Sequence, residues 1–197
     1  MSATIEEKYS IVRERDERFA FELAKMVIEK PRASIWIIFL PALFIFHAYW
    51  INRYKKGIHD FSRHYLQSKR RALDKSLEEC KSCKSPQTGS ASAPEVHIKQ
   101  PADPIRKHTL KEQEILRAHY RVLLHSPGRT YPSLVKNAYR TSGQYRYFLN
   151  RLVRAEEEIN KAVIHAHHPA AEAQEVVQRM ERCSDILRET ELKQIFS

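Results

Sequence analysis

Hydrophobic and polar positions divide the chain into one uncharged run and several segments with helical spacing. The run covers residues 34–51 (SIWIIFLPALFIFHAYWI), whose only clearly polar side chains are Ser34 and His47. As a helix rising ~1.5 Å per residue, it reaches ~27 Å and nearly crosses the ~30 Å hydrocarbon core of a bilayer. A buried helix of a soluble domain usually keeps a polar side, and this run has none. The pattern therefore predicts a membrane segment.

Aromatic residues and one proline refine this membrane segment. Trp36 lies near one end and Tyr49 and Trp50 near the other, as is typical of side chains in the headgroup layers. Pro41 lies near the middle and predicts a kink or a break, because it removes a backbone hydrogen bond. A kinked single span and a re-entrant hairpin both fit. Lys and Arg are more frequent after the run than before it, which favours a single span with a cytoplasmic C-terminal part.

An amphipathic helix is predicted in residues 1–33, before the membrane segment. Apolar side chains recur there at helical spacing, with Asp16 interrupting the series and Pro31 expected to end the helix. The apolar positions are Ile5, Tyr9, Val12, Phe19, Leu23 and Met26. We expect this face to pack against a partner helix, in this chain or in another copy of it.

A basic helix is predicted in residues 52–84, directly after the membrane segment, with Gly57 as a candidate hinge. Basic residues beside a membrane segment are attracted to anionic headgroups, at ~1 kcal/mol each near the surface. The candidate lipid-contacting residues are Lys55, Lys56, Arg63, Lys69, Arg70 and Arg71. The alternative is a solvated face that only fixes the orientation of the membrane segment.

Residues 85–104 (SPQTGSASAPEVHIKQPADP) predict a flexible linker, because four prolines and a Ser/Ala/Gly tract lack hydrophobic periodicity. Cys80 and Cys83 stand just before it in a Cys-x-x-Cys pattern. A zinc site needs a second pair of Cys or His ligands at suitable spacing, and no such pair follows. We therefore predict free thiols in a reducing compartment, with no bound metal and no other cofactor.

Residues 105–197 are predicted to form a C-terminal helical hairpin or small bundle, so the expected fold class is all-α. Helical patterns cover residues 110–124, 132–168 and 169–196. The last pattern places four side chains on one face, Val176, Met180, Cys183 and Leu187. Only 4 glycines occur in 197 residues, which favours helices over turn-rich β-structure or Gly-rich phosphate loops.

An acid-free basic region overlaps the helix expected over residues 132–168. Residues 115–155 contain no Asp or Glu, and one side of the expected helix gathers four basic residues and a tyrosine. This basic set consists of Lys136, Arg140, Tyr147, Arg151 and Arg154. Three interpretations fit it: neutralisation by the acidic last helix, binding of anionic lipid or an acidic protein, and binding of nucleic acid. In the third, bases would stack on Tyr120, Tyr131, Tyr139, Tyr145 and Tyr147.

The net charge of +10 and mean hydropathy of −0.57 are averages that conceal this segregation. Catalytic motifs are not found, and His165, His167 and His168 have no carboxylate or thiol spaced to orient them, so we expect no enzymatic activity. The sequence predicts a membrane-anchored helical scaffold or adaptor. A membrane-associated nucleic-acid-binding protein is the alternative, disfavoured because no known reader motif accompanies the basic residues.

Overall fold

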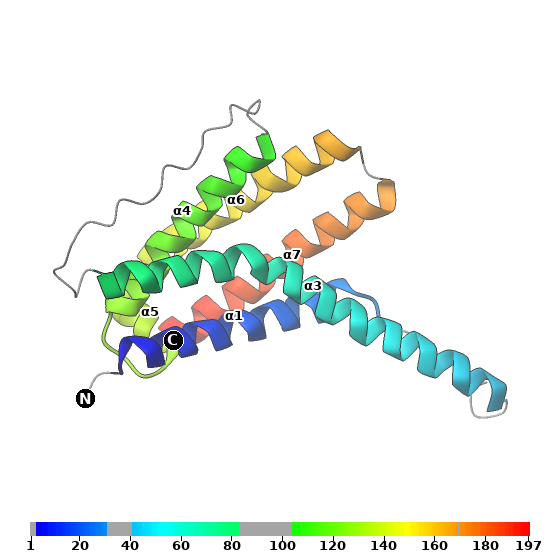
Figure 1. Cartoon of the computed structure of the whole chain (residues 1–197), viewed down its shortest axis with the longest axis horizontal. Helices are drawn as coiled ribbons and strands as arrows, with labels where there is room; N and C mark the ends of the chain where they lie inside the picture. Colours follow the sequence, from blue (N-terminus) through cyan, green and yellow to red (C-terminus); the bar gives the residue numbers. More distant parts are fainter. Residues whose placement is uncertain (1–2, 31–40, 83–103, 169) are drawn as a thin grey trace.

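Every regular element in the described part of the chain is an α-helix. The structure, a computed structural model, describes residues 3–30, 41–82, 104–168 and 170–197. The helices in these ranges, drawn in Figure 1, are α1 (Ile5–Val27), α3 (Pro41–Ser82), α4 (Pro104–His125), α5 (Tyr131–Tyr139), α6 (Ser142–His167) and α7 (Ala171–Phe196). The predicted all-α fold class is confirmed.

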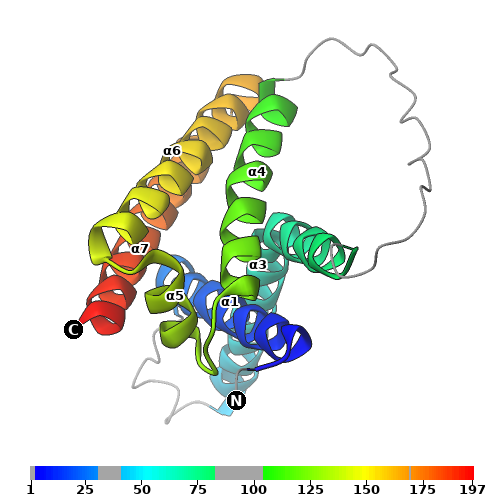
Figure 2. The same ribbon diagram turned by 90° about the vertical axis from the view of Figure 1, so that its left-hand side faces the viewer.

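Five of these helices pack in a closed ring. Helix α1 lies against α3, α3 against α4, α4 against α6, α6 against α7, and α7 returns to α1. The short α5 covers one end of the ring, where it contacts α1, α4, α6 and α7. In Figure 2, α4 and α6 rise side by side, and α5 lies below them, near both ends of the chain. The Pro41 end of α3 extends beyond the other helices, away from α5 (Figure 1).

Buried apolar side chains from all of these helices form one core. A member from each, in chain order, is Val12, Leu73, Leu116, Leu134, Leu149 and Leu192. Residues before and after the predicted linker therefore contribute to the same core, and each large aliphatic side chain buried there contributes ~1.5–3 kcal/mol. Residues 85–103 of the linker lie outside the described residues, and its last residue, Pro104, begins α4.

Helix α1 forms close to its predicted bounds, but Asp16 has an unexpected role. The Thr4 hydroxyl accepts a hydrogen bond from the Glu7 backbone, and the Glu7 carboxylate accepts one from the Thr4 backbone, so both ends of a capping box are present. Asp16, expected to interrupt the apolar face, is 5% exposed and accepts a 2.6 Å hydrogen bond from the Tyr120 hydroxyl. It is a buried polar contact between α1 and α4.

The single helix predicted over residues 132–168 is wrong, because the chain turns at Arg140 between α5 and α6. Arg140 has φ of +57°, which non-glycine residues rarely adopt, and this ends α5. Thr141 then caps α6, its hydroxyl accepting a 3.2 Å hydrogen bond from the Gln144 backbone. The basic set is therefore divided: Lys136 belongs to α5, Arg140 to the junction, and the other members to α6.

Two further predicted features can be located in the structure. The candidate hinge Gly57 lies inside α3, which runs as one helix from Pro41 to Ser82. On α7, Met180, Cys183 and Leu187 of the predicted face are half-buried and Val176 is 45% exposed, whereas the buried positions are Ser184, Arg188, Leu192 and Ile195. The ion pair between Arg188 and Glu156 on α6 holds this face inward.

The predicted membrane segment, residues 34–51, lies partly outside the described residues. Trp36 is among the residues up to 40 that the structure does not describe. Helix α3 begins at Pro41, and its first turns contain three further positions of the segment, His47, Tyr49 and Trp50. Among the helices that the structure describes, none has a stretch long and apolar enough to cross a membrane.

Candidate functional site

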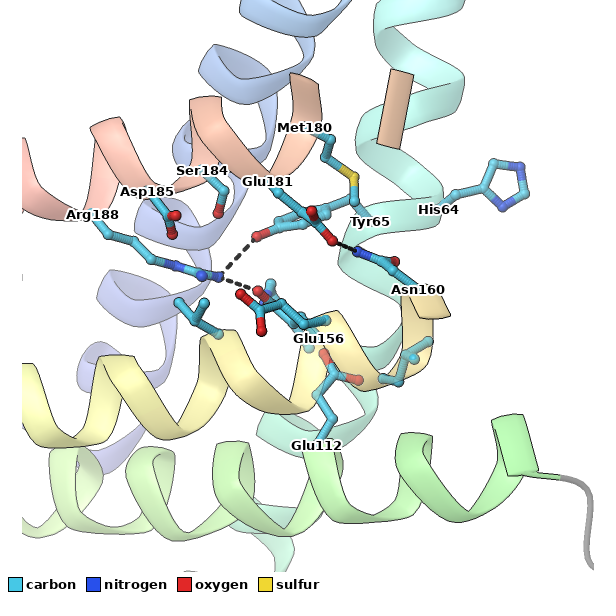
Figure 3. Close-up of a pocket in the computed structure, with 14 residues that line it drawn as sticks. His64, Tyr65, Glu112, Glu156, Asn160, Met180, Glu181, Ser184, Asp185 and Arg188 are labelled. Atoms are coloured by element: carbon cyan, nitrogen blue, oxygen red, sulfur yellow. Dashed lines mark hydrogen bonds and ion pairs between the residues drawn. The ribbon is translucent and has the colours of Figure 1, made fainter. Parts of the chain in front are cut away.

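Glu156 of α6 contacts two buried cations, and these three residues are the centre of the candidate site. Its Oε1 lies 3.1 Å from Nζ of Lys69 on α3, and its Oε2 lies 2.6 Å from Nη2 of Arg188 on α7. Lys69 is 6% exposed and Arg188 5%. The Arg188 guanidinium also lies 3.5 Å from the Tyr65 hydroxyl (Figure 3). One carboxylate therefore connects three helices; we call Lys69, Glu156 and Arg188 the ionic triad.

All members of the ionic triad favour their charged forms, although burial opposes each charge. Burial raises the pKa of Glu156, but the attraction of Arg188 and Lys69 outweighs it and holds the pKa below its usual value. Burial likewise acts to lower the pKa of Lys69, yet Tyr65 and the carboxylate of Glu156 raise it above the usual value. The same two groups raise the pKa of Arg188 against its own burial. Each cation is paired with the Glu156 carboxylate, and the triad as a whole carries one net positive charge.

Glu112 of α4 places another buried carboxylate beside the ionic triad. It is 6% exposed and accepts a 2.8 Å hydrogen bond from the Ser68 hydroxyl. Burial raises the pKa of Glu112; Lys69 opposes this rise, and the negative charge of Glu156 adds to it. Folding therefore makes Glu112 harder to ionise than in the unfolded chain, whereas it makes Glu156 easier to ionise.

A pocket of about 270 Å³ opens next to these charges, lined by residues of α3, α4, α6 and α7. Its apolar lining consists of Val153, Ile159 and Met180. Three further acidic residues line it, Glu157, Glu181 and Asp185. The Asn160 amide donates a 2.9 Å hydrogen bond to Glu181, and Figure 3 shows both side chains between α6 and α7. Burial raises the pKa of Asp185, as it does for Glu112.

Most tyrosines of the acid-free region are inside the bundle, so their predicted role in stacking on bases is wrong. Tyr120, Tyr131 and Tyr145 are 7% exposed or less. Tyr139 is half-buried, and its hydroxyl lies 2.6 Å from Nδ1 of His119. Tyr147 is the exception, at 67% exposure. The other four tyrosines contribute to apolar packing and to hydrogen bonds inside the bundle.

His119 is a core residue rather than an acid–base group at the surface. Its ring stacks on Phe148 with centroids 4.0 Å apart, and it is 5% exposed. Burial lowers the pKa of His119 well below the usual value, and the charges of Arg15 and Lys69 lower it further. The imidazole therefore stays neutral at physiological pH.

The predicted lipid-contacting residues of α3 divide into exposed and engaged side chains. Lys69 is not available at the surface, because it belongs to the ionic triad. Arg70 pairs with Glu17 of α1 at 2.9 Å. The exposed remainder consists of Lys55, Lys56, Arg63 and Arg71.

All five residues of the basic set are exposed. The Arg151 guanidinium lies over the Tyr147 ring, 5.9 Å from its centroid. The acidic helix α7 does not neutralise the set: its Glu189 pairs with Arg146 at 2.7 Å, and its Glu191 with Arg15 of α1. Across the residues that the structure describes, no member of the set forms an ion pair.

Among the described residues, the histidine and cysteine candidates are not brought together in one site. His165 and His168 contact one another edge to face, at 5.9 Å between ring centroids. Cys80 is buried, with Sγ 3.6 Å from Nδ1 of His125, and Cys83 lies outside the described residues. Within the described ranges, no group of three or more His, Cys, Asp or Glu side chains has an arrangement suited to a metal ion.

Comparisons with known proteins give no relative: no protein-family model, no curated protein and no solved structure matches the chain.

Replacing Glu156 with Gln is expected to lower the free energy of unfolding by ~3–5 kcal/mol, because Lys69 and Arg188 then remain buried without compensation. Urea denaturation followed by circular dichroism measures this change. The matched control is Glu157→Gln, whose side chain is half-buried and outside the ionic triad. Equal stability of the two variants would contradict the central role of Glu156.

Replacing Glu112 with Gln is expected to raise the free energy of unfolding at pH 7.5. A carboxyl whose pKa is raised by folding contributes stability below its unfolded pKa, and this contribution is lost as pH rises through the folded value. The advantage of Glu112→Gln over the original protein should therefore shrink as pH falls towards ~4, near the pKa of an exposed Glu. Urea titrations of both proteins at pH 7.5 and pH 4 measure the difference in their free energies of unfolding. A difference that favours the variant more at pH 4 than at pH 7.5 would contradict a raised pKa of Glu112.

Proposed function

We propose that this protein is a membrane-attached helical scaffold whose bundle displays the basic set to an acidic protein partner. Residues 34–51 provide the attachment, and both flanking segments stay on the cytoplasmic side. The single observation that carries this proposal is the packing of α1, which lies before the apolar run, against helices that follow it.

The contacts of α1 support re-entrant insertion of residues 34–51. Lys8 Nζ donates a 3.1 Å hydrogen bond to the carbonyl of Leu124, and the Ser62 hydroxyl donates one of 3.3 Å to the carbonyl of Ala20. A single span would place residues 1–33 and 52–197 on opposite sides of the bilayer and would separate all of these partners. The charge count that favoured a single span is therefore outweighed by packing, and the apolar run enters and leaves on one side.

The exposed basic residues of α3 stand next to this insertion. Lys55 and Lys56 lie about one turn after the end of the apolar run, and Arg63 lies two turns further along the helix. Each basic residue near an anionic surface contributes ~1 kcal/mol, so these three suit the attachment of the bundle to acidic lipid.

The basic set suits a different partner, because it is remote from the proposed insertion. Helix α5 and the start of α6 lie at the end of the bundle away from Pro41 (Figure 1). The set is exposed and without ion pairs in the described part of the chain, as a surface for an acidic protein requires. Nucleic acid fits it less well, since Tyr147 is the only exposed tyrosine there.

Protease protection in sealed vesicles tests the attachment. The full chain, tagged at both ends, is incorporated into vesicles of phosphatidylcholine and phosphatidylserine and treated with protease from outside. Both tags are expected to be cleaved together in accessible molecules and protected together in the rest. Protection of one tag alone would show a single span, and release of the protein by alkaline washing would reject insertion.

Charge reversal tests the basic set. Arg151→Glu combined with Arg154→Glu is expected to weaken binding of a fluorescent polyglutamate peptide at least tenfold, equal to ~1.4 kcal/mol, measured by anisotropy at low salt. Arg182→Glu, on the exposed part of α7, is the matched control. Unchanged binding by the double variant, or tighter binding of a single-stranded RNA than of polyglutamate by the original protein, would reject the acidic-protein partner.

A further inference from the structure

Ser184 is a buried hydroxyl that faces the pocket without a hydrogen-bond partner. It is 4% exposed, and among the described residues nothing donates to or accepts from its Oγ. A helical serine can bond the carbonyl one turn earlier, as Ser76 does with Ala72 at 2.7 Å, but Ser184 does not. Figure 3 shows its side chain directed from α7 towards α6, into the space between them. An unsatisfied buried hydroxyl costs about 1–3 kcal/mol. A ligand whose polar group forms a hydrogen bond with the Ser184 hydroxyl would remove this cost and bind more tightly.

The charges around the pocket favour a cation. Both basic residues of its lining, Lys69 and Arg188, are engaged by the two oxygens of Glu156. His64 points away from the pocket in Figure 3. Four further carboxylates line the space, those of Glu112, Glu157, Glu181 and Asp185. An anion would be repelled by these groups, whereas a cation would relieve their mutual repulsion.

The same lining favours an organic cation over a metal ion. In the described part of the chain the acidic side chains do not converge on a point as metal ligands do. Figure 3 places Glu112 on one wall, from α4, and Glu181, Ser184 and Asp185 on the opposite wall, from α7. Apolar side chains, including Ile159 and Met180, line the space as well. Acidic groups on opposite walls with apolar lining suit a chain that is charged at both ends.

We propose that the pocket between α3, α4, α6 and α7 binds a small aliphatic diamine, with one ammonium group at Glu112 and the other at Glu181, Asp185 and the Ser184 hydroxyl. The methylene chain lies against Ile159 and Met180. The pocket volume of about 270 Å³ is that of a site for a small metabolite rather than for a peptide or a nucleotide. The ionic triad supplies the rigid floor of the site and is not itself a ligand-binding group.

Isothermal titration calorimetry with 1,5-diaminopentane tests this site on the full chain in a neutral detergent at pH 7.5. Saturable binding is expected, with 1-pentylamine at least tenfold weaker because it satisfies one wall only, and no binding of the neutral 1,5-pentanediol. No heat from the diamine, or equal binding of the diol, would overturn the proposal. Membrane attachment does not enter this measurement, so its outcome is independent of the proposed scaffold function.

Variants locate the binding within the pocket. Glu112→Gln keeps the size of the side chain, removes its charge, and is expected to weaken diamine binding at least tenfold. Ser184→Ala provides a second variant in a separate wall, with an expected loss of about threefold to tenfold for one hydrogen bond. Glu114→Gln, on the exposed face of the same helix as Glu112, is the matched control and should bind as the original protein does. Unchanged affinity in both Glu112→Gln and Ser184→Ala would reject the site.

Discussion

The carboxylate of Glu156 is the interaction on which the arrangement of the bundle depends. Its two oxygens contact Lys69 of α3 and Arg188 of α7, so a single side chain fixes the relative positions of three helices. Buried charges tolerate little displacement, because any increase in distance leaves each charge in a medium of low polarity without compensation. Apolar packing allows small shifts of a helix along its neighbour, whereas this triad does not. The pocket beside the triad is lined by the same three helices, so the triad also fixes the positions of its walls.

A comparable polar contact attaches α1 to the rest of the molecule. Arg15 pairs with Glu191 of α7 and with Asp16, while Asp16 accepts the hydrogen bond of Tyr120 from α4. These contacts lie among apolar side chains that bring α1 into the common core. The position of α1 thus determines both the closure of the ring and, in the proposed function, the side of the membrane on which the N-terminal segment remains.

Periodicity in the sequence was sufficient to predict helices but not their charged interior. The amphipathic pattern of residues 5–26 identifies α1, and the Ser-Pro-Gly sequence after His125 marks the end of α4. The break at Arg140 was missed because apolar spacing continues through it, although Thr141 is a typical N-cap residue and was the available signal.

The ionic triad was missed for a different reason. Lys69 stands in a basic segment and Glu156 in a run of three glutamates, and both patterns are typical of exposed helix faces. Their burial follows from a pairing across 87 residues, which local spacing does not encode. Ser184 and Arg188 lie one turn apart and continue with Leu192 as a buried line on α7, a pattern visible only if an arginine is allowed in the core.

The contact between α1 and α7 also sets an order of events during synthesis. Arg15 and Glu191 are 176 residues apart, so the ring closes only after the last helix has left the ribosome. Contacts so distant in sequence form late, because the entropy of loop closure is lost before they provide any stabilisation. Residues 34–51 emerge long before that point, while α1 still has no α7 to pack against. In the proposed function, the apolar run therefore reaches the bilayer before the ring closes, and the bundle assembles afterwards at the membrane surface.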